Sequence, residues 1–516
     1  MLDLGRTFLQ SVERAPLATA IVDGERRLTY AQWASKVGAV QQGLANLGLR
    51  AGDHLVSLLQ NRMEAATLHW ACQFAGIVMT PLNWRAKPEE IVHGLQDSGA
   101  SVLVYEMVCA EAVDEALKVQ PARLIFVGEG DAAGTPYEAC FAQACEPVPQ
   151  VQAQDLSLML YTSGTTGAPK GVPRRQRAER LAALAHVAQN QYGYGERTLG
   201  VMPLYHTMGV RSLLALAMVD GCFVCMPRFD AAQALRSIAQ ERITHLYLVP
   251  TLYHDLLAHP TFDSTDISSV RRLGFAGAPM HDALLLRLQK AFKPELFVNH
   301  YGSSEIYTFS INRDAVGKPG SAGRAGINTR LRVVTLDGKS VHALAAPMEE
   351  GQIIADLLSD EAFEGYHNRP DANAKSLREG WYFTGDTGYV DHDGDLFVTG
   401  RVDDMIISGG ENISPVDIES VISLHPAVDE VAVAGLKDER WGQRVVAFVK
   451  RKHQVSPEGL DQHCRTSDLV NFKRPREYVF VDEIPKSPVG KVLRRKLIAG
   501  EYTPEASPES KLPQPI

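Results

Sequence analysis

The chain has 516 residues, of which 45% are apolar and 22% are charged, and its formal net charge is −9 at pH 7. Its length suggests about three domains, and its composition is typical of globular proteins. The acidic balance argues against wholesale nucleic-acid binding, because the average field would repel a polyanion. Basic residues still gather in short runs such as residues 174–180. Such runs suit small phosphorylated ligands, although a solvated charged face is their commoner meaning.

The sequence also bears on the cellular location of the protein. No run of about 18 uncharged apolar residues occurs, so we expect no membrane span. The N-terminus has neither a basic start nor an apolar core, so we expect no export signal. Seven scattered cysteines favour reduced thiols in the cytoplasm. Cys222 and Cys225 have CxxC spacing without a second pair, and we expect a buried strand there rather than a metal site.

The first 150 residues alternate between helical and strand patterns. Helical patterns cover residues 29–44 and 63–76, and strand patterns cover residues 54–59 and 77–83. This alternation predicts a parallel sheet covered by helices. We therefore expect an α/β fold for the large N-terminal part of the chain.

The most informative stretch is a glycine- and hydroxyl-rich run at residues 160–171, directly after an apolar segment. It contains three glycines, four serine or threonine side chains and one lysine. Glycine lets backbone N–H groups approach an anion, hydroxyls add donors and lysine adds charge, so the run predicts a phosphate-binding loop. The spacing is not that of a Walker A loop, and a plain turn between two strands is the alternative reading of this run alone. The expected phosphate contacts are Thr162, Ser163, Gly164, Thr165, Thr166, Gly167 and Lys170.

Two later strand patterns end in turns that carry polar groups. Residues 273–279 and 298–305 each run from an apolar strand into a turn, and ligands in open α/β sheets bind beyond such strand ends. Glu305 there is either a magnesium ligand, because magnesium takes carboxylates and phosphate oxygens, or an acid at a helix N-terminus. Asp386 stands in the run at residues 381–388. A carboxylate can accept two hydroxyl donors at once, but Gly-Asp in a hairpin is also an ordinary turn.

These runs, taken together, resemble the adenylate-forming superfamily of acyl- and aryl-CoA ligases, peptide-synthetase adenylation domains and firefly luciferase. The resemblance spans nearly the whole chain and implies a large N-terminal domain, residues 1–402, that holds ATP and a carboxylic acid. It also implies a small, mobile α+β domain, residues 403–516, with a hinge at Asp403. We expect a disordered tail from about residue 502, where prolines recur.

The resemblance also implies roles for single residues. Asp386 would hold the ribose, Arg401 would contact ribose or phosphate, and Glu305 would bind magnesium. Ser304 stands where the family pattern has threonine, so a hydroxyl is kept. The further implied nucleotide contacts are Gly277, Ala278, Pro279, Asn299, His300, Tyr301, Gly302 and Ser303.

Catalysis is implied for a lysine in the loop at residues 485–492. Lys491 would bridge the attacking carboxylate and the α-phosphate, which lowers the barrier to bringing two anions together; a solvated loop lysine is the alternative. His206, counted with Lys491 and Glu305 among the catalytic residues, would close over the substrate carboxylate as a pocket wall and would not carry a proton.

The acid pocket and the coenzyme A site follow from the same resemblance. Tyr307 could hydrogen-bond a hydroxyl or stack on a ring. The implied acid pocket comprises His206, Thr207, Met208, Ala276, Gly277, Ser303, Ile306 and Tyr307. The implied coenzyme A contacts are Gly409, Gly410, Trp441, Phe472, Lys473, Arg474 and Arg476.

Several segments, among them residues 405–413 and 438–443, resemble bacterial benzoate-type CoA ligases most. The expected reaction joins an aromatic acid to coenzyme A through an acyl-adenylate, with ATP and Mg²⁺. A medium-chain fatty acyl-CoA ligase would share every ATP residue, and an adenylate-forming enzyme that does not use coenzyme A is a more distant alternative. The sequence leaves open whether the protein is a monomer or a homodimer.

Overall fold

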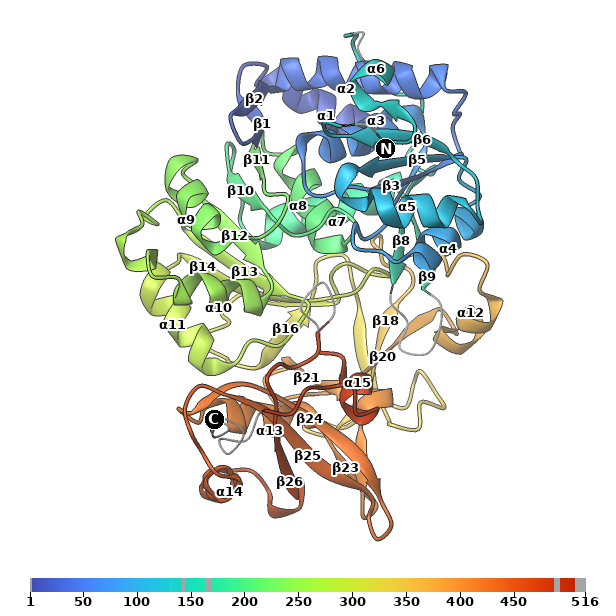
Figure 1. Ribbon diagram of the computed structural model, residues 1–516. Coiled ribbons are helices and arrows are strands. Elements are labelled where there is room, and N and C mark those ends of the chain that lie inside the picture. Colours follow the sequence, from blue (N-terminus) through green and yellow to red (C-terminus); the bar gives the residue numbers. More distant parts are fainter. Residues whose placement is uncertain (1, 131, 142–143, 163–168, 487–491, 506–516) are drawn as a thin grey trace, which may run out of the picture.

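The computed structural model describes residues 2–130, 132–141, 144–162, 169–486 and 492–505 (Figure 1). Figure 1 shows a large body built from the N-terminal four-fifths of the chain and a smaller C-terminal body beside it. The architecture is the expected α/β arrangement, with helices packed on the sheets of the large body. Among the described residues no helix combines the length and the apolar character needed to cross a bilayer.

The first sheet of the large body has seven strands in the order β7-β6-β5-β3-β4-β8-β9, and only the β8–β9 pair is antiparallel. Helix α2 starts at a capping box between Thr29 and Gln32. The expected helix–strand alternation is thus confirmed here. The strands are β3 (His54–Leu58), β4 (Val78–Pro81), β5 (Val102–Glu106), β6 (Arg123–Val127), β7 (Thr135–Pro136), β8 (Leu156–Thr162) and β9 (Lys170–Arg175). The helices are α1 (Leu4–Arg14), α2 (Tyr30–Asn46), α3 (Met63–Ala75), α4 (Pro88–Ser98), α5 (Ala110–Leu117) and α6 (Tyr137–Cys140).

The second sheet has more strands, and it is parallel in one part and antiparallel in another. Strands β14-β13-β12-β10-β11-β1 run parallel, and the strands from β15 onward are antiparallel. The strands are β1 (Thr19–Asp23), β2 (Arg26–Thr29), β10 (Arg197–Gly200), β11 (Cys222–Cys225), β12 (His245–Leu248), β13 (Arg272–Ala276), β14 (Leu296–Tyr301), β15 (Ser310–Asn312), β16 (Ser321–Ala325), β17 (Leu331–Val334), β18 (Gly351–Asp356), β19 (Leu377–Arg378), β20 (Trp381–Val390) and β21 (Leu396–Arg401). The helices are α7 (Gln176–Gln189), α8 (Thr207–Leu216), α9 (Ala231–Gln240), α10 (Pro250–Ala258), α11 (Asp282–Phe292) and α12 (Pro370–Ser376).

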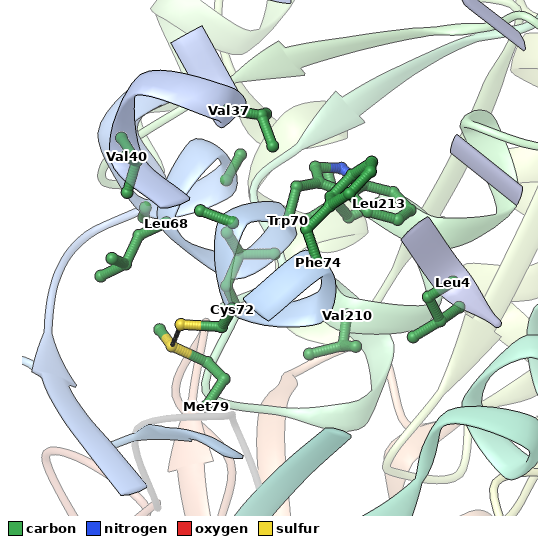
Figure 2. Packing of buried hydrophobic residues seen from close by; sticks show 14 of the residues in the cluster. Leu4, Val37, Val40, Leu68, Trp70, Cys72, Phe74, Met79, Val210 and Leu213 are labelled. Carbon is green, nitrogen blue, oxygen red and sulfur yellow. Dashed lines mark hydrogen bonds between the residues drawn. The ribbon is translucent and has the colours of Figure 1, made fainter. Parts of the chain in front are cut away.

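One hydrophobic core joins helices of the two sheets. Figure 2 shows Trp70 and Phe74 of α3 packed near Val210 and Leu213 of α8, with Leu4 of α1 beside them. All five side chains are almost fully buried. Burying an apolar side chain of this size contributes about 1.5–3 kcal/mol, so this contact fixes α8 against the first sheet. Cys222 and Cys225 are free and buried in β11, as expected.

The C-terminal body is a small α+β domain. Apolar clusters cover both faces of its sheet, and the sheet order is β23-β22-β25-β24 with β26 paired to β25. Its strands are β22 (Ile406–Ser408), β23 (Glu411–Ile413), β24 (Val428–Asp438), β25 (Gly442–Arg451) and β26 (Glu477–Phe480). Its helices are α13 (Pro415–Ser423), α14 (Pro457–Thr466) and α15 (Arg494–Ile498).

The two bodies meet around the expected boundary. Asp403 lies in a short 3-10 helix, Val402–Asp404, between β21 and β22. Ser414 donates a hydrogen bond to the carbonyl oxygen of Thr399, and His254 of α10 lies 3.8 Å from the Asp429 carboxylate. The hinge at Asp403 and the boundary after residue 402 stay predictions.

The start of the expected tail needs correction. Residues 502–505 pack along the small domain: the Tyr502 ring lies 5.1 Å from the Phe448 ring, and Glu505 pairs with Arg451 at 2.7 Å. The prolines do not prevent this order, because Pro504 forms an isolated bridge with Val481 that needs no donor from proline. Residues 506–516 lie outside the described part of the chain.

Candidate active site

Asp386 lies at the centre of the first cluster of expected nucleotide residues. β20 places its carboxylate between Tyr301 of β14, whose hydroxyl donates to Oδ2, and Arg401 of β21, which donates to Oδ1 at 2.8 Å. Burial alone would lower the pKa of Arg401, but the Asp386 carboxylate raises it overall. Gly385 has φ +77°, and a Cβ there would lie 3.1 Å from the Arg401 Nη2 atom, so glycine allows the close approach.

Arg401 has one buried donor to spare. Its Nε has no hydrogen-bond partner among the described residues, and an unpaired buried donor costs about 1–3 kcal/mol. A ribose or phosphate oxygen would satisfy that donor. The cluster therefore fits the hydroxyl-rich and anionic parts of a nucleotide.

His300, by contrast, projects to the other face of β14 from Asn299 and Tyr301, because side chains alternate along a strand. Its ring is buried and hydrogen-bonds with Asn190 of the loop after α7. Asn299 donates to the Ser321 carbonyl oxygen at 2.9 Å. The expected nucleotide contact of His300 therefore needs correction for the side chain, which belongs to an interior cluster.

A second cluster brings Glu305 and Lys170 together around a tyrosine. The Tyr366 hydroxyl donates to Glu305 Oε1 at 2.6 Å, and the Lys170 ammonium lies 4.3 Å from the centre of the Tyr366 ring. Burial lowers the pKa of Lys170, and the Glu305 carboxylate opposes that shift. A carboxylate fixed by one hydroxyl and facing a lysine is suited to hold Mg²⁺ beside phosphate oxygens.

The glycine-rich loop begins and ends at this cluster. Thr162 at the end of β8 pairs with Lys170 at the start of β9, so the antiparallel pair holds both ends of the loop together. Ser163, Gly164, Thr165, Thr166 and Gly167 lie outside the described residues, and their phosphate contacts stay predictions.

The buried pair of Arg174 and Glu179 is a structural feature that the sequence reading missed. Arg174 donates to Glu179 at 2.7 Å, and both side chains are fully buried. Arg174 also donates to the carbonyl oxygen of Glu305 at 2.9 Å. The basic run at 174–180 therefore begins with a residue that positions Glu305, and Arg174 is not part of an exposed patch.

The expected acid-pocket residues come from three elements that meet. His206 caps the N-terminus of α8, where its side chain accepts from the Met208 N–H. Ala276 and Gly277 end β13, and a Cβ on Gly277 would lie 3.8 Å from the Met208 sulfur. Ser303 donates from its backbone to Ile306 at 3.0 Å and so closes the turn after β14. The structure thus gathers these positions at the C-terminal ends of the parallel strands.

Tyr307 requires a correction. Its hydroxyl donates to Glu179 at 3.0 Å, and the Arg174 guanidinium lies 4.1 Å from the ring centre. The hydroxyl is therefore engaged by a buried carboxylate inside the protein and is not free to read a hydroxyl on a ligand. Ile306 is also fully buried, in a cluster with Val172 and Phe309.

Some of the expected coenzyme A residues are exposed, and others form ion pairs or hydrogen bonds within the protein. Gly409 and Gly410 form the β22–β23 turn with φ +63° and +89°, and a Cβ on Gly409 would lie 2.8 Å from the Trp441 ring. Trp441 and Phe472 are both partly exposed. Lys473 pairs with Asp417 at 2.6 Å. Buried Arg474 donates to Asp461 and Asn471, whereas Arg476 is exposed.

Lys491 lies outside the described residues. Its flanking segments are held together, because Leu493 donates to the Pro485 carbonyl oxygen at 2.8 Å and Lys486 forms an isolated β-bridge with Val492. Lys486 also pairs with Glu430 of β24 at 2.7 Å. The catalytic role of Lys491 stays a prediction.

One acidic cluster lies away from this site. Asp391, Asp393 and Asp395 approach one another after β20, but the Lys318 ammonium lies 2.6–2.9 Å from all three. The lysine supplies the positive charge that a metal ion would bring. The cluster is therefore an ion-pair network in the described structure.

Comparison with known proteins identifies the family. The AMP-binding enzyme family matches residues 8–367, and the AMP-binding enzyme C-terminal domain matches residues 417–491. The chain is similar to 4-chlorobenzoate–CoA ligase of Arthrobacter sp, with 33% identity over 94% of this chain and 93% of the relative. It is also similar to indoleacetate–CoA ligase of Aromatoleum aromaticum, with 34% identity over 94% and 96% of the two chains. Long-chain-fatty-acid–CoA ligase FadD13 of Mycobacterium tuberculosis is 33% identical over 96% and 98%.

Solved structures agree with that similarity. The anthranilate CoA ligase AuaEII in complex with anthranoyl-AMP superposes with a TM-score of 0.90 at 28% identity, covering 97% of each chain. O-succinylbenzoate coenzyme A synthetase from Bacillus subtilis, in complex with ATP and magnesium ion, gives a TM-score of 0.83 at 27% identity, covering 95% of this chain and 98% of the other. The chain therefore belongs to the AMP-binding enzyme family, the adenylate-forming superfamily that its motifs resemble.

Proposed function

We propose that the protein is an ATP-dependent ligase that joins an aromatic carboxylic acid to coenzyme A. The observation that carries the proposal is that two clusters lie within electrostatic reach of each other, because the Arg401 charge, after burial and Glu305, also acts on the pKa of Lys170. Asp386 and Arg401 offer a ribose site, and Glu305 and Lys170 offer a phosphate and magnesium site at the ends of the glycine-rich loop. The acid-pocket turn, which Ser303 and Ile306 close, contains Glu305.

In the proposed complex the nucleotide lies between these clusters. Asp386 accepts from the ribose hydroxyls, and the free Nε of Arg401 donates to the nucleotide. Glu305, held by Tyr366, would supply a carboxylate oxygen for Mg²⁺. A related synthetase is known in complex with ATP and magnesium ion. When bound, Mg²⁺ neutralises phosphate charge that would otherwise repel the attacking carboxylate.

The first step makes a leaving group. An oxygen of the substrate carboxylate attacks the α-phosphorus of ATP, the bond to the β-phosphate breaks, and pyrophosphate departs. Lys170 and the proposed catalytic Lys491 offset the negative charge that gathers at the α-phosphate. His206 closes the pocket beside the reacting carboxylate.

The second step forms the thioester. The thiol of coenzyme A loses its proton, its sulfur attacks the acyl carbon, and AMP leaves with the oxygen that came from the acid. We place the thiol path beside exposed Trp441, Phe472 and Arg476 and the glycine turn. Because these residues belong to the small domain, this step requires the domain to turn about Asp403. A cytoplasmic location would supply both ATP and coenzyme A.

The aromatic preference is supported by the names of several relatives, which act on 4-chlorobenzoate, indoleacetate or anthranilate. A fatty acyl-CoA ligase is the second candidate, because a relative of that name is 33% identical over 96% of the chain. That activity would share the nucleotide site and differ only in the acid.

A product assay tests the proposal. The purified protein is incubated with ATP, Mg²⁺, coenzyme A and one acid from a panel of aryl and alkyl acids. We expect AMP and pyrophosphate only when an acid is present, and a thioester only when coenzyme A is also present. Release of ADP, or no consumption of ATP with any acid, would contradict the proposal. A preference for alkyl acids would select the fatty acyl alternative.

A further inference from the structure

Helix α8 carries a buried arginine that the motifs do not include. Arg211 is 2% exposed and lies four residues after Thr207, so the two share one face of the helix. Its Nη1 atom donates to the Tyr307 carbonyl oxygen at 3.0 Å and to the Thr308 hydroxyl at 2.9 Å. Its Nη2 atom donates to the Tyr247 hydroxyl. Arg211 thus contacts the same turn and helix that form the acid pocket.

Arg211 has no carboxylate partner within ion-pair distance among the described residues, because its three acceptors are uncharged. Its Nε has no hydrogen-bond partner among them either. Glu361 interacts with Arg211 only through space, and its oxygens accept instead from the Thr308 N–H and the Asn328 amide. A buried charge without a partner is costly, whereas buried Arg174 pairs directly with Glu179.

Two histidines behind Arg211 do not supply negative charge. The His186 and His300 rings pack edge-on against Tyr247, with centroids 4.8 Å and 5.3 Å away. Burial, and then the Arg211 charge, lower the pKa of both histidines, so both are neutral near pH 7. His300 Nδ1 has no partner among the described residues.

The sheet beneath α8 connects Arg211 with the acid pocket. Tyr247 pairs with Gly274, which lies two residues before Ala276 and therefore on the same face of β13. A Cβ on Gly274 would lie 2.9 Å from the Tyr247 ring, so glycine is needed for the tyrosine to lie there. Ala276 and Met208 of the expected pocket thus share one layer with Tyr247 and Arg211.

We propose that the acid bound in this pocket is a dicarboxylic aromatic acid whose second carboxylate accepts from Arg211. This inference rests on the proposed function and names its substrate class. The reacting carboxylate lies toward His206 and the nucleotide, and the second carboxylate points toward the Nε of Arg211. The second carboxylate supplies the direct ionic partner that Arg211 lacks among the described residues, where Glu361 acts on it only through space.

A purely structural role for Arg211 makes a different prediction. Arg211 also ties the turn at residues 303–308 to α8. If that were its only role, its removal would weaken the turn and would slow the reaction of every acid by a similar factor.

The test compares acids of matched shape on the wild-type protein. The panel is benzoate, benzene-1,3- and 1,4-dicarboxylate, and 3- and 4-carbamoylbenzoate, which replace the second carboxylate by a neutral group of the same size. The readout is kcat/KM for acid-dependent AMP release with coenzyme A. We expect at least one dicarboxylate to exceed its carbamoyl counterpart by about 10²-fold or more, because a site built to bind a polar group rejects analogues that lack it.

The variant Arg211→Met then assigns that preference. We expect the dicarboxylate value to fall by about 10²-fold more than the benzoate value, which loses only what the weakened turn costs every acid. Arg211→Lys, which keeps the charge, should retain part of the preference. Equal loss for both acids in Arg211→Met, or no wild-type preference for the charged acid, would overturn the inference.

The wild-type comparison does not depend on whether the variants fold. If neutral aryl or alkyl acids are the better substrates, the ligase function stands and the inference fails. If no acid supports AMP release, the proposed function fails as well.

Discussion

The nucleotide side and the acid side of the candidate site are built differently. On the nucleotide side the charged groups are paired with one another, as Asp386 is with Arg401, or held by a hydroxyl, as Glu305 is by Tyr366. On the acid side the buried cation, Arg211, is bonded to uncharged groups and retains an unpartnered Nε among the described residues. The first arrangement suits a ligand common to a whole family, and the second suits a feature particular to one substrate.

The largest expected effect tests the nucleotide side. Lys491→Ala should lower carboxylate-dependent pyrophosphate exchange by about 10²–10³-fold, because it removes a positive charge from the developing transition state. The variant should still convert supplied acyl-adenylate to thioester. Lys496→Ala, at a partly exposed lysine in the same region, is the control. Equal loss of both half-reactions would count against this division of roles.

Asp386→Asn should raise the KM for ATP by about 10²-fold, because it removes the charge beside Arg401 and weakens charge-assisted hydrogen bonds. The matched control is Asp393→Asn in the turn between β20 and β21, where the side chain is 76% exposed. An unchanged KM for ATP in Asp386→Asn would show that Asp386 does not bind the ribose.

Asp403→Pro should leave adenylation unchanged and slow thioester formation by about tenfold, because proline restricts the backbone rotation that domain movement requires. Asp403→Ala keeps the backbone free and serves as the control. If both half-reactions slowed equally in the proline variant, Asp403 would not be the hinge.

Acidification should destabilise the fold through its buried histidines. Burial lowers the pKa of His69 to about 4, whereas the pKa of a histidine in an unfolded chain is about 6.5. Below about pH 6.5 the unfolded state therefore binds the proton first, so stability present at pH 7 is lost as the pH falls toward 4. Between about pH 7 and 5.5 His69 alone should cost about 1 kcal/mol in the free energy of unfolding.

Urea unfolding at both pH values measures this loss, and His69→Leu should reduce it. The buried His186 and His300 beside the acid pocket, whose pKa values burial also lowers, should add to it. A stability that stayed constant or rose on acidification would show that these histidines are not buried as described.

The smallest effect concerns the contact between Tyr366 and Glu305. Tyr366→Phe removes the hydroxyl that donates at 2.6 Å but keeps the ring beneath Lys170. We expect the KM for Mg·ATP to rise by about threefold, as befits one hydrogen bond. Tyr389→Phe, whose ring stacks on Phe397 on the neighbouring strand, is the control. A change confined to the KM for the acid would show that Tyr366 contributes to acid binding and not to Mg·ATP binding.

The parts of the fold and of the site that could be predicted from the sequence are those with local signals. Helix and strand periodicity predicted α2, α3, β3 and β4 to within a few residues, and local motifs marked Lys170, Glu305, Asp386 and Arg401. These signals are local, because a run of glycines or a strand end is visible in a few neighbouring residues.

The contacts that complete the site are not local. Tyr366 reaches Glu305 across 61 positions, and Arg174 reaches Glu361 across 187. Tyr307 stood in a turn that resembled a pocket wall, yet its hydroxyl donates to the buried carboxylate of Glu179, 128 positions away. A sequence pattern cannot show which distant carboxylate a buried donor will meet.

The most direct measurement of the central claim follows one oxygen atom. An acid whose carboxylate carries a heavy oxygen isotope is converted with ATP and coenzyme A, and the AMP and pyrophosphate are analysed by mass spectrometry. If the carboxylate attacks the α-phosphorus and AMP later leaves from the acyl carbon, one heavy oxygen should appear in AMP. Heavy oxygen in pyrophosphate, or AMP formed without any label, would contradict the account.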